Sequence, residues 1–590
     1  MCARSAFPRA ARRVFLLFAA GVLLPACGGG GGGGGTADPA PGGGGGPGGG
    51  GNPSAPVTIS GVARYQFPPP RVACGGRDFA AVELRPIRQA TVQLLAEADD
   101  AVLDSVVTDE TGAFAVTADR DTRVYLRVRA ELKRTGVPAW DVEVRDNTSN
   151  TTAPLAQRPL YVLDTEPFDS GTSDMTRDVT AATGWGGTSY VGPRAAAPFA
   201  ILDTAYSAIR LVLSAEPEAT FAPLDIFWSP DNRPAEGDVA DGDIATSHYR
   251  PGQRQLFLLG ALDDPDEFDE HVVAHEWGHY YEDTFSRSDS IGGPHMLGDA
   301  LDMRVAFGEG WATALSGMAL ADPLYCDTTL TSGFPINIEG GGGGTPGWFN
   351  EISVLRIVYD LWDTEDDGAD TGSIGFGPIH AAMTGPQATT PAFTSIFSFA
   401  EALRTIEPAA VPLLDALLEE ADISLSSAFG ENESNGGQRD DALPVYTEIA
   451  PDGTTHVLCS SRNTDAGGDG NKLGAHRFLR MSLTRPAQLH FDIRTRDVAS
   501  LPPDDPGDDR DQSDPDILIL RNGQVQNASV PGENPQGFSP DANQEVFTTS
   551  NVLQAGEYAM ALTEFRYSDP DTHPDYPDRT CFDVTVTEAS

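Results

Sequence analysis

One pentapeptide sets the strongest constraint on how this chain can fold: His275-Glu276-Trp277-Gly278-His279. Histidines four positions apart lie on one face of an α-helix, one turn from each other, so both imidazoles can reach a single cation. The acidic stretch before the motif predicts where the helix begins, with Asp264 as N-cap and Pro265 at the first helical position. The sequence therefore predicts a helix that extends to about residue 284 and presents a metal-binding face.

A second helix is expected to supply the third metal ligand. Residues 305–321 are rich in small side chains, so this segment can pack closely on the first helix and direct Glu309 inward. Three protein ligands with a fourth position left for water form the arrangement of catalytic zinc sites, because the metal lowers the pKa of the water. Glu276 is the candidate general base for that water. A zinc domain without hydrolytic activity and a chance occurrence of the motif are the alternatives.

These residues resemble the gluzincin metallopeptidases, the thermolysin-like and aminopeptidase-like group, in which such a helix is followed by a glutamate ligand on a second helix. The resemblance covers residues 271–317. It implies an α+β zincin-like domain and a Zn²⁺ cofactor held by His275, His279 and Glu309. The implied reaction is hydrolysis of a peptide or protein substrate with Glu276 as the base. An endopeptidase is favoured, because the sequence shows no motif for binding a free amino terminus.

The sequence departs from this group at two places. Thr313 stands where thermolysin-like enzymes carry an aspartate, so hydrogen-bond support for a zinc histidine is expected from another residue. No motif selects the Tyr or His that stabilises the oxyanion in such enzymes, and Tyr359 and His380 are both candidates.

The first residues predict export from the cytoplasm. Residues 1–26 hold four arginines and then an apolar run, residues 14–24, that is too short to span a membrane, which is typical of a signal peptide. Leu24-Pro25-Ala26-Cys27 resembles the bacterial lipoprotein signal, in which Cys27 becomes the lipidated first residue. The glycine-rich residues 27–55 would then be a flexible tether at an extracytoplasmic membrane surface, most simply the outer membrane or cell surface. An ordinary secreted protein cleaved nearby is the alternative.

Cysteine usage and charge fit that location. Cys74, Cys326, Cys459 and Cys581 can form two disulfides in an oxidising compartment, with three possible connectivities. A formal net charge of −47 repels nucleic acid, so no nucleic-acid partner is expected. The expected partners are a peptide or protein substrate and, through the lipid anchor, a membrane.

Strand and helix patterns divide the remainder into three predicted domains. Residues 56–155 alternate short apolar strands with turns, which predicts a β-sandwich, and the segments 59–63, 90–94 and 108–114 resemble the carboxypeptidase regulatory-like domain. Residues 156–455 form the predicted zinc metallopeptidase domain. Its expected helices cover residues 197–214, 267–284, 305–321, 351–362 and 411–420.

Residues 456–590 return to a strand pattern and predict a second sandwich, in which segments 514–520 and 553–558 resemble the bacterial pre-peptidase C-terminal domain. The predicted fold class is therefore multidomain, with an α+β zincin-like catalytic domain between two all-β sandwiches. A cell-surface binding or adhesion lipoprotein with a vestigial zinc domain is the competing function, and a zinc hydrolase acting on a non-peptide amide is a third.

Calcium is a second candidate ion. Asp363, Glu365 and Asp367 place oxygen atoms at alternate positions before Gly368, but Ile374 occupies the twelfth position where a calcium loop has a bidentate Glu. The acidic residues 504–516 offer another candidate. A solvated acidic loop is the alternative for both segments.

Overall fold

The computed structural model describes residues 55–262, 264–340, 343–365, 371–462, 470–502, 512–528, 543–568 and 575–589. These residues belong to one compact unit, Ala55–Ser590, and combine helices with several β-sheets. The predicted leader, Cys27 and the tether up to residue 54 lie outside the described residues, as do Asp367, Gly368 and residues 504–511 of the acidic segment. No helix in the described part of the chain is long and apolar enough to cross a membrane.

A nine-stranded sheet runs through the first half of the described chain. Its strand order is β13-β14-β12-β7-β6-β3-β4, and β8 and β9 also pair with β6. The strands are β3 (Ala90–Ala96), β4 (Val102–Val107), β6 (Arg123–Arg134), β7 (Trp140–Arg145), β8 (Val162–Asp164), β9 (Phe168–Asp169), β12 (Leu224–Trp228), β13 (His248–Arg250) and β14 (Gln255–Leu258). β12 pairs in parallel with both β7 and β14. Hydrogen bonds therefore join strands on both sides of residue 155, and the division placed there stays a prediction.

A five-stranded sheet is built around β1 (Val57–Phe67), whose side chains alternate between buried and half-buried over its whole length. This period of two is the signature of a strand with one face on a core, and it explains why the segment reads as a strand in the sequence. The partners of β1 are β2 (Glu83–Pro86), β5 (Ala113–Ala118), β10 (Met175–Thr176) and β11 (Val179–Ala181).

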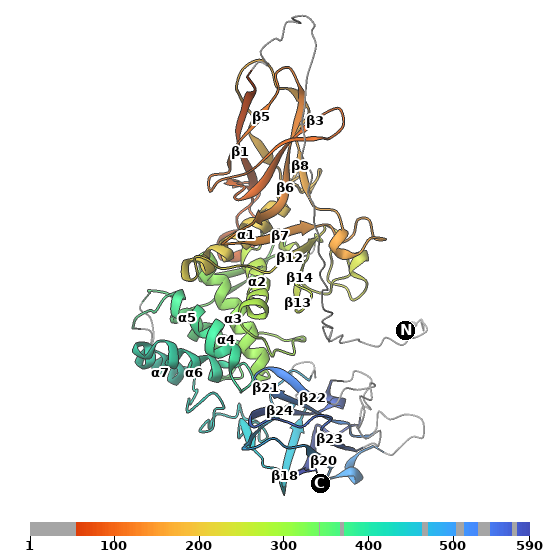
Figure 1. Cartoon of the computed structure of the whole chain (residues 1–590), viewed down its shortest axis with the longest axis vertical. Helices are drawn as coiled ribbons and strands as arrows, with labels where there is room; N and C mark the ends of the chain where they lie inside the picture. The colour runs from red at the N-terminus through yellow and green to blue at the C-terminus, as the bar shows by residue number, and fades with distance from the viewer. Residues whose placement is uncertain are drawn as a thin grey trace, which may run out of the picture. The chain divides into compact units, whose positions relative to one another are not determined.

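The helices follow in the central region, where Figure 1 shows α2, α3 and α4 as neighbours. They are α1 (Ala197–Ala215), α2 (Glu270–Phe285), α3 (Met303–Leu320), α4 (Glu351–Asp360), α5 (Phe376–Ala382), α6 (Ile396–Ile406) and α7 (Val411–Glu420), with the hairpin β15 (Leu324–Thr328) and β16 (Gly333–Asn337) after α3. The predicted start of the motif helix is wrong: α2 begins at Glu270 with Asp269 at the N-cap, and a short 3₁₀ turn, Asp266–Phe268, precedes it.

Glycines set the close approach of the three central helices. A Cβ on Gly278 would lie 2.7 Å from the Ala312 Cα, so α2 and α3 pack backbone to backbone at that point. A Cβ on Gly310 would lie 2.7 Å from the Glu351 carbonyl oxygen, so α4 approaches α3 equally closely. The prediction of a small-residue helix that packs tightly on the motif helix is confirmed in this geometry.

The C-terminal region is all β. One sheet has the order β17-β19-β24-β21-β22 and the other the order β18-β25-β20-β23. The strands are β17 (Tyr446–Glu448), β18 (Asp452–Ser461), β19 (His476–Leu483), β20 (Leu489–Thr495), β21 (Pro515–Arg521), β22 (Gln524–Ala528), β23 (Gln544–Thr548), β24 (Gly556–Glu564) and β25 (Arg579–Glu588). Side chains of both sheets share a hydrophobic core of their own, which is the arrangement of a sandwich.

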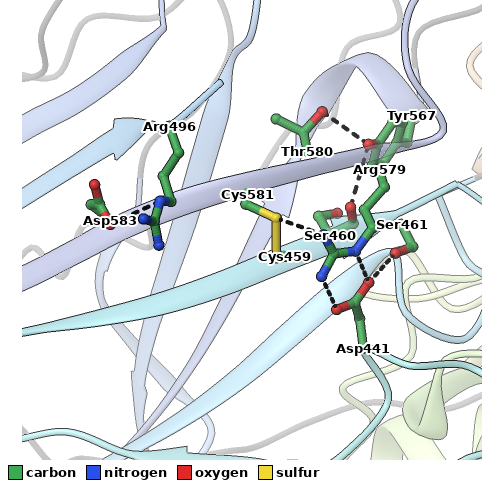
Figure 2. Close-up of a disulfide and its surroundings, with 10 residues drawn as sticks. All are labelled: Asp441, Cys459, Ser460, Ser461, Arg496, Tyr567, Arg579, Thr580, Cys581 and Asp583. Carbon is green, nitrogen blue, oxygen red and sulfur yellow. Dashed lines mark hydrogen bonds and ion pairs between the residues drawn. A yellow bond between two sulfur atoms is a disulfide. The ribbon is translucent and has the colours of Figure 1, made fainter. Parts of the chain in front are cut away.

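Cys74, Cys326, Cys459 and Cys581 form two disulfides, Cys74–Cys326 and Cys459–Cys581, which selects one of the three possible connectivities. The first joins the turn after β1 to the β15–β16 hairpin, and the second links the neighbouring strands β18 and β25. Figure 2 shows the second bond beside Arg579, whose guanidinium donates two hydrogen bonds to Asp441 at 2.7 and 2.9 Å.

Candidate metal centre

The three residues chosen from the sequence as metal ligands come together in space. His275 and His279 project from α2, and Glu309 projects from the facing turn of α3. The Glu309 Oε2 atom lies 3.3 Å from the His275 Nε2 atom and 3.5 Å from the His279 Nε2 atom. The two Nε2 atoms are 3.1 Å apart, and one ligand atom from each residue lies within 4.8 Å of the others.

This donor set fits a zinc ion. Two imidazole nitrogens and one carboxylate oxygen are ligands that zinc prefers, and their spacing allows all three to approach a common point at about 2 Å. Glu309 is only 8% exposed, while the imidazoles of His275 and His279 remain 15% and 20% exposed, so one side of the cluster is open to solvent. Three ligands with an open side are the arrangement of a catalytic centre.

Charges within the cluster are strongly coupled. Burial raises the pKa of Glu309, but the charge of His279 and hydrogen bonds from both histidines outweigh burial and hold the pKa well below its usual range. Burial lowers the pKa of His279, but the Glu309 carboxylate more than offsets it and raises the pKa to about 9. The fold thus keeps a carboxylate and imidazole groups in contact, and a divalent cation would balance the same carboxylate.

Thr313 holds the ring of His275. The His275 Nδ1 atom lies 3.0 Å from the Thr313 Oγ1 atom, and a neutral imidazole with a proton on Nδ1 donates to that hydroxyl. This leaves Nε2 free to bind a metal. The expectation that another residue supports the zinc histidine is wrong, because α3 packs so closely on α2 that even a short hydroxyl reaches the ring from one turn beyond Glu309.

Glu276 lies on the same helix, beside His275, and is 8% exposed. Its charge contributes to the pKa shifts of His279, of His248 on β13 and of Tyr325 on β15. The general base proposed from the motif therefore directly follows a candidate ligand in the chain and interacts electrostatically with another.

The two candidates for oxyanion stabilisation have other partners. The His380 Nδ1 atom lies 2.8 Å from the Tyr281 hydroxyl and its Nε2 atom 3.0 Å from Glu216 Oε2, so both ring nitrogens are engaged away from the three ligands. Tyr359 is 2% exposed and packs against Gly317, two turns beyond Glu309. The structure provides no contact that selects either residue for this role.

One further residue, His295, approaches Glu309, and Glu351 lies next to His295, although no sequence motif indicates either residue. His295, in the loop between α2 and α3, has its Nε2 atom 3.6 Å from Glu309 Oε2 and 3.4 Å from Glu351 Oε2. Glu351 is the first residue of α4, where Asn350 caps the helix. Sequence reasoning missed both, because a lone His in a glycine-rich loop has no periodic relation to the helix motif.

A second group of acidic residues lies near the start of α2: Asp264, Asp266 and Asp327. It is separate from the two segments predicted to bind calcium, so calcium binding at those segments stays a prediction. Burial and the charges of Asp269 and Asp264 raise the pKa of Asp266 well above its usual range. Burial and neighbouring negative charges therefore disfavour the charged form of Asp266.

A family comparison gives the central region a peptidase context. Residues 216–402 match the family model described as the Mycolysin C-terminal domain, and this range contains α2, α3 and all three candidate ligands. No curated protein matches the chain. This part of the chain is thus a peptidase-related domain, and the site within it has the donor set just described.

Three solved structures align with parts of the chain at low similarity. The pre-peptidase C-terminal domain of collagenase from Bacillus anthracis shows 6% identity and a TM-score of 0.14, over 24% of this chain and 94% of that chain. A 9R-lipoxygenase from Cyanothece PCC8801 shows 11% identity and a TM-score of 0.13, over 28% and 24%. PliG from Aeromonas hydrophila, a periplasmic inhibitor of g-type lysozyme, shows 10% identity and a TM-score of 0.12, over 24% and 97%. Similarity at this level carries no argument about fold or function.

Proposed function

We propose that this chain is a zinc-dependent peptidase of the gluzincin type, an endopeptidase in preference to an aminopeptidase. The observation that carries the proposal is the convergence of His275, His279 and Glu309 from two helices onto one point, with their ligand atoms all within 4.8 Å of one another. The Mycolysin-type match over the same helices supports a peptide or protein substrate.

The roles of the residues follow from their positions. Zinc bound there would supply a Lewis acid for the scissile carbonyl and lower the pKa of a water molecule. His275 and His279 would hold the ion from α2, Thr313 orients the ring of His275, and Glu309 would add the negative ligand from α3. Glu276 accepts the proton of the attacking water and delivers it to the leaving amine.

The test compares the wild-type chain, Glu276→Gln and a chelator-treated sample on a mixed peptide library, with zinc content measured on each. We expect cleavage by wild type and a loss of about 10²- to 10⁴-fold in Glu276→Gln at unchanged zinc content, since only the base is removed. Glu270→Gln is the matched control, because Glu270 lies on the same helix but pairs with Arg85 at 2.9 Å. Stoichiometric zinc in wild type without turnover on any peptide would favour the non-catalytic surface-binding protein.

We also propose that the protein is exported and anchored by lipid on Cys27 at the outside of a bacterial membrane. The apolar segment and the Leu24-Pro25-Ala26-Cys27 sequence support this location. The two disulfides also support it, because disulfides form and persist in oxidising compartments. Mass spectrometry of the N-terminal fragment from membranes is expected to find acyl chains on Cys27, and Cys27→Ser is expected to release the protein from the membrane fraction. An unmodified Cys27 in membrane-derived protein contradicts the anchor.

A further inference from the structure

The loop between α2 and α3 places His295 beside Glu309, one of the candidate metal ligands. Its Nδ1 atom lies 3.1 Å from the Gly293 carbonyl oxygen, and its Nε2 atom faces the carboxylates of Glu309 and Glu351. Both ring nitrogens therefore face oxygen acceptors, which fixes the plane of the ring. The oxygen atom that His295 approaches, Glu309 Oε2, is the same atom that approaches His275 and His279.

The contact suits a positioning role better than metal ligation. His295 is absent from the group of ligand atoms that lie within 4.8 Å of one another, and its imidazole instead bridges two carboxylates that come from α3 and α4. Glu351 is 5% exposed, and within the described part of the chain its Oε1 atom has no hydrogen-bond partner, whereas its Oε2 atom faces His295. A histidine between these two acids fixes the direction in which Glu309 presents its oxygen.

A segment from the C-terminal region holds this loop in place. Lys472 is fully buried, and its Nζ atom donates to the Pro294 carbonyl at 2.7 Å and to Asn471 Oδ1 at 3.0 Å, with Asp299 Oδ2 at 3.3 Å. The three donors of the ammonium group thus have three oxygen partners, one of them on the residue directly before His295. The fold tolerates a fully buried ammonium group at Lys472 because the group is paired with a carboxylate and hydrogen-bonded.

Hydrogen bonds of the residues on either side of Lys472 also hold the loop between α2 and α3. Asn471 donates to the carbonyl oxygens of Gly292 and Pro294 at 3.0 and 3.2 Å. The Leu473 amide donates to the Ala300 carbonyl at 2.9 Å, and the Asp302 amide donates to the Asn471 carbonyl at 2.8 Å. Residues 471–473 therefore bind the loop on both sides of His295 and at the N-cap of α3, the helix that carries Glu309.

We propose that His295 is a positioning residue for the metal ligand Glu309, and that residues 471–473 of the C-terminal region hold His295 in place through Lys472. The proposal rests on the zinc centre of the proposed function. It makes the C-terminal region a part of the metal centre, since the affinity of that centre for zinc would depend on a buried lysine outside the matched residues 216–402.

The first experiment measures zinc affinity of the full chain by competition with a chromophoric chelator, with zinc alone as the probe. We expect His295→Gln to lower the affinity by about 10- to 100-fold, the usual effect of losing a residue that orients a metal ligand. His490→Gln is the matched control, because His490 lies on β20 and bonds to Thr548. Equal affinity in His295→Gln and wild type overturns the positioning role, whereas a wild-type chain that binds no zinc overturns the proposed function itself.

The second experiment asks whether Lys472 acts through His295. Lys472→Met is expected to weaken zinc binding several-fold in the wild-type background and to have no further effect in the His295→Gln background, because the loop then has no positioning side chain to hold. Lys133→Met, a change in the other lysine of the chain, is the control. Effects that add in the double variant overturn the coupling. Thermal unfolding of each variant shows whether it is folded, and Asn471→Ala replaces Lys472→Met should the latter not fold.

Discussion

Two clusters of ionisable residues lie along α2, and both contain buried carboxyl groups. The pKa is lowered for the carboxyl of one cluster and raised for carboxyls of the other. At the middle of the helix, the buried carboxylate of Glu309 stays ionised because two imidazoles contact it. At the start of the helix, Asp264, Asp266 and Asp327 have no imidazole among them, and burial raises the pKa of Asp266 and Asp327. Ligand atoms within 4.8 Å of one another are therefore not sufficient for a zinc site. Whether such a cluster suits zinc also depends on the chemical nature of its donor groups.

The acidic residues at the start of α2, among them the N-cap residue Asp269, are stabilised by other groups. Arg77, from the turn closed by the Cys74–Cys326 disulfide, forms a buried ion pair with Asp269, and Thr328 donates to the same carboxylate at 2.9 Å. Ser247 donates to Asp266. Hydrogen bonds, one guanidinium and protonation thus stabilise the start of α2, and the imidazoles one and two turns later remain available for a metal.

The largest expected effect tests which cluster binds zinc. His279→Gln is expected to lower zinc affinity by on the order of 10³-fold. The binding free energy of a zinc site with four ligands is about 10 to 16 kcal/mol, and this variant loses one ligand. Asp266→Asn, the matched change in the acidic cluster, is expected to leave the affinity unchanged. Zinc content after dialysis and chelator competition provide the measurement. If Asp266→Asn released the ion instead, the comparison between the clusters would be reversed.

Asp269, at the N-cap of α2, should give the stability of the protein a pH dependence. Burial raises the pKa of Asp269 to about 7, against the opposing charge of Arg77, while the unfolded value is near 3.8. A carboxyl with a raised pKa in the folded state stabilises most below its unfolded pKa, and this contribution is lost as the pH rises from about 4 to about 7. We expect a decrease of at most about 4 kcal/mol in the free energy of unfolding over this range.

Denaturant unfolding at several pH values measures this slope, and Asp269→Asn is expected to flatten it because the amide does not titrate. Glu97→Gln provides a surface control, since the Glu97 carboxylate is paired with an exposed Arg123. An identical slope in Asp269→Asn and wild type would assign the dependence to other groups.

Loss of Arg77 should affect stability and spare the metal. Arg77→Met leaves the Asp269 carboxylate buried without its cation, which is expected to cost about 3 kcal/mol of unfolding free energy at pH 8. Thermal unfolding measures the loss. Zinc affinity of the folded variant is expected to stay at the wild-type value, and a parallel loss of zinc would show that the two clusters are coupled along α2.

The smallest expected effect sharpens the role of Thr313. Thr313→Val keeps the shape of the side chain but removes the oxygen that lies 3.0 Å from His275 Nδ1, so the ring loses its orienting partner. We expect zinc affinity to fall by about tenfold. Ser316→Ala removes a hydroxyl from the same helix that bonds only to the Thr313 carbonyl at 2.7 Å, and it should leave the affinity unchanged. Chelator competition distinguishes the two variants.

The amino-acid sequence alone was enough to predict that His275, His279 and Glu309 come together and that their helices pack closely. Periodicity places His275 and His279 on one face, and the small residues around Glu309 allow the approach that Gly278 and Gly310 make possible. These are local properties, because a helix has a fixed geometry and backbone contact needs small side chains. Strand β1 and the strands of the C-terminal region can also be predicted locally, because their apolar residues recur with a period of two.

Only the tertiary structure decided which partners from distant segments surround the site. His295, Glu351 and Lys472 come from a loop, a helix start and the C-terminal region, and the contacts among them depend on packing that no local pattern encodes. The same is true of Thr313, whose contact with His275 depends on the distance between two helices, and of the sheet that joins β7 to β12 across residue 155. Sequence periodicity determines which face of a helix or strand a side chain occupies. The residue that packs against that face depends on the tertiary packing of segments distant in the sequence.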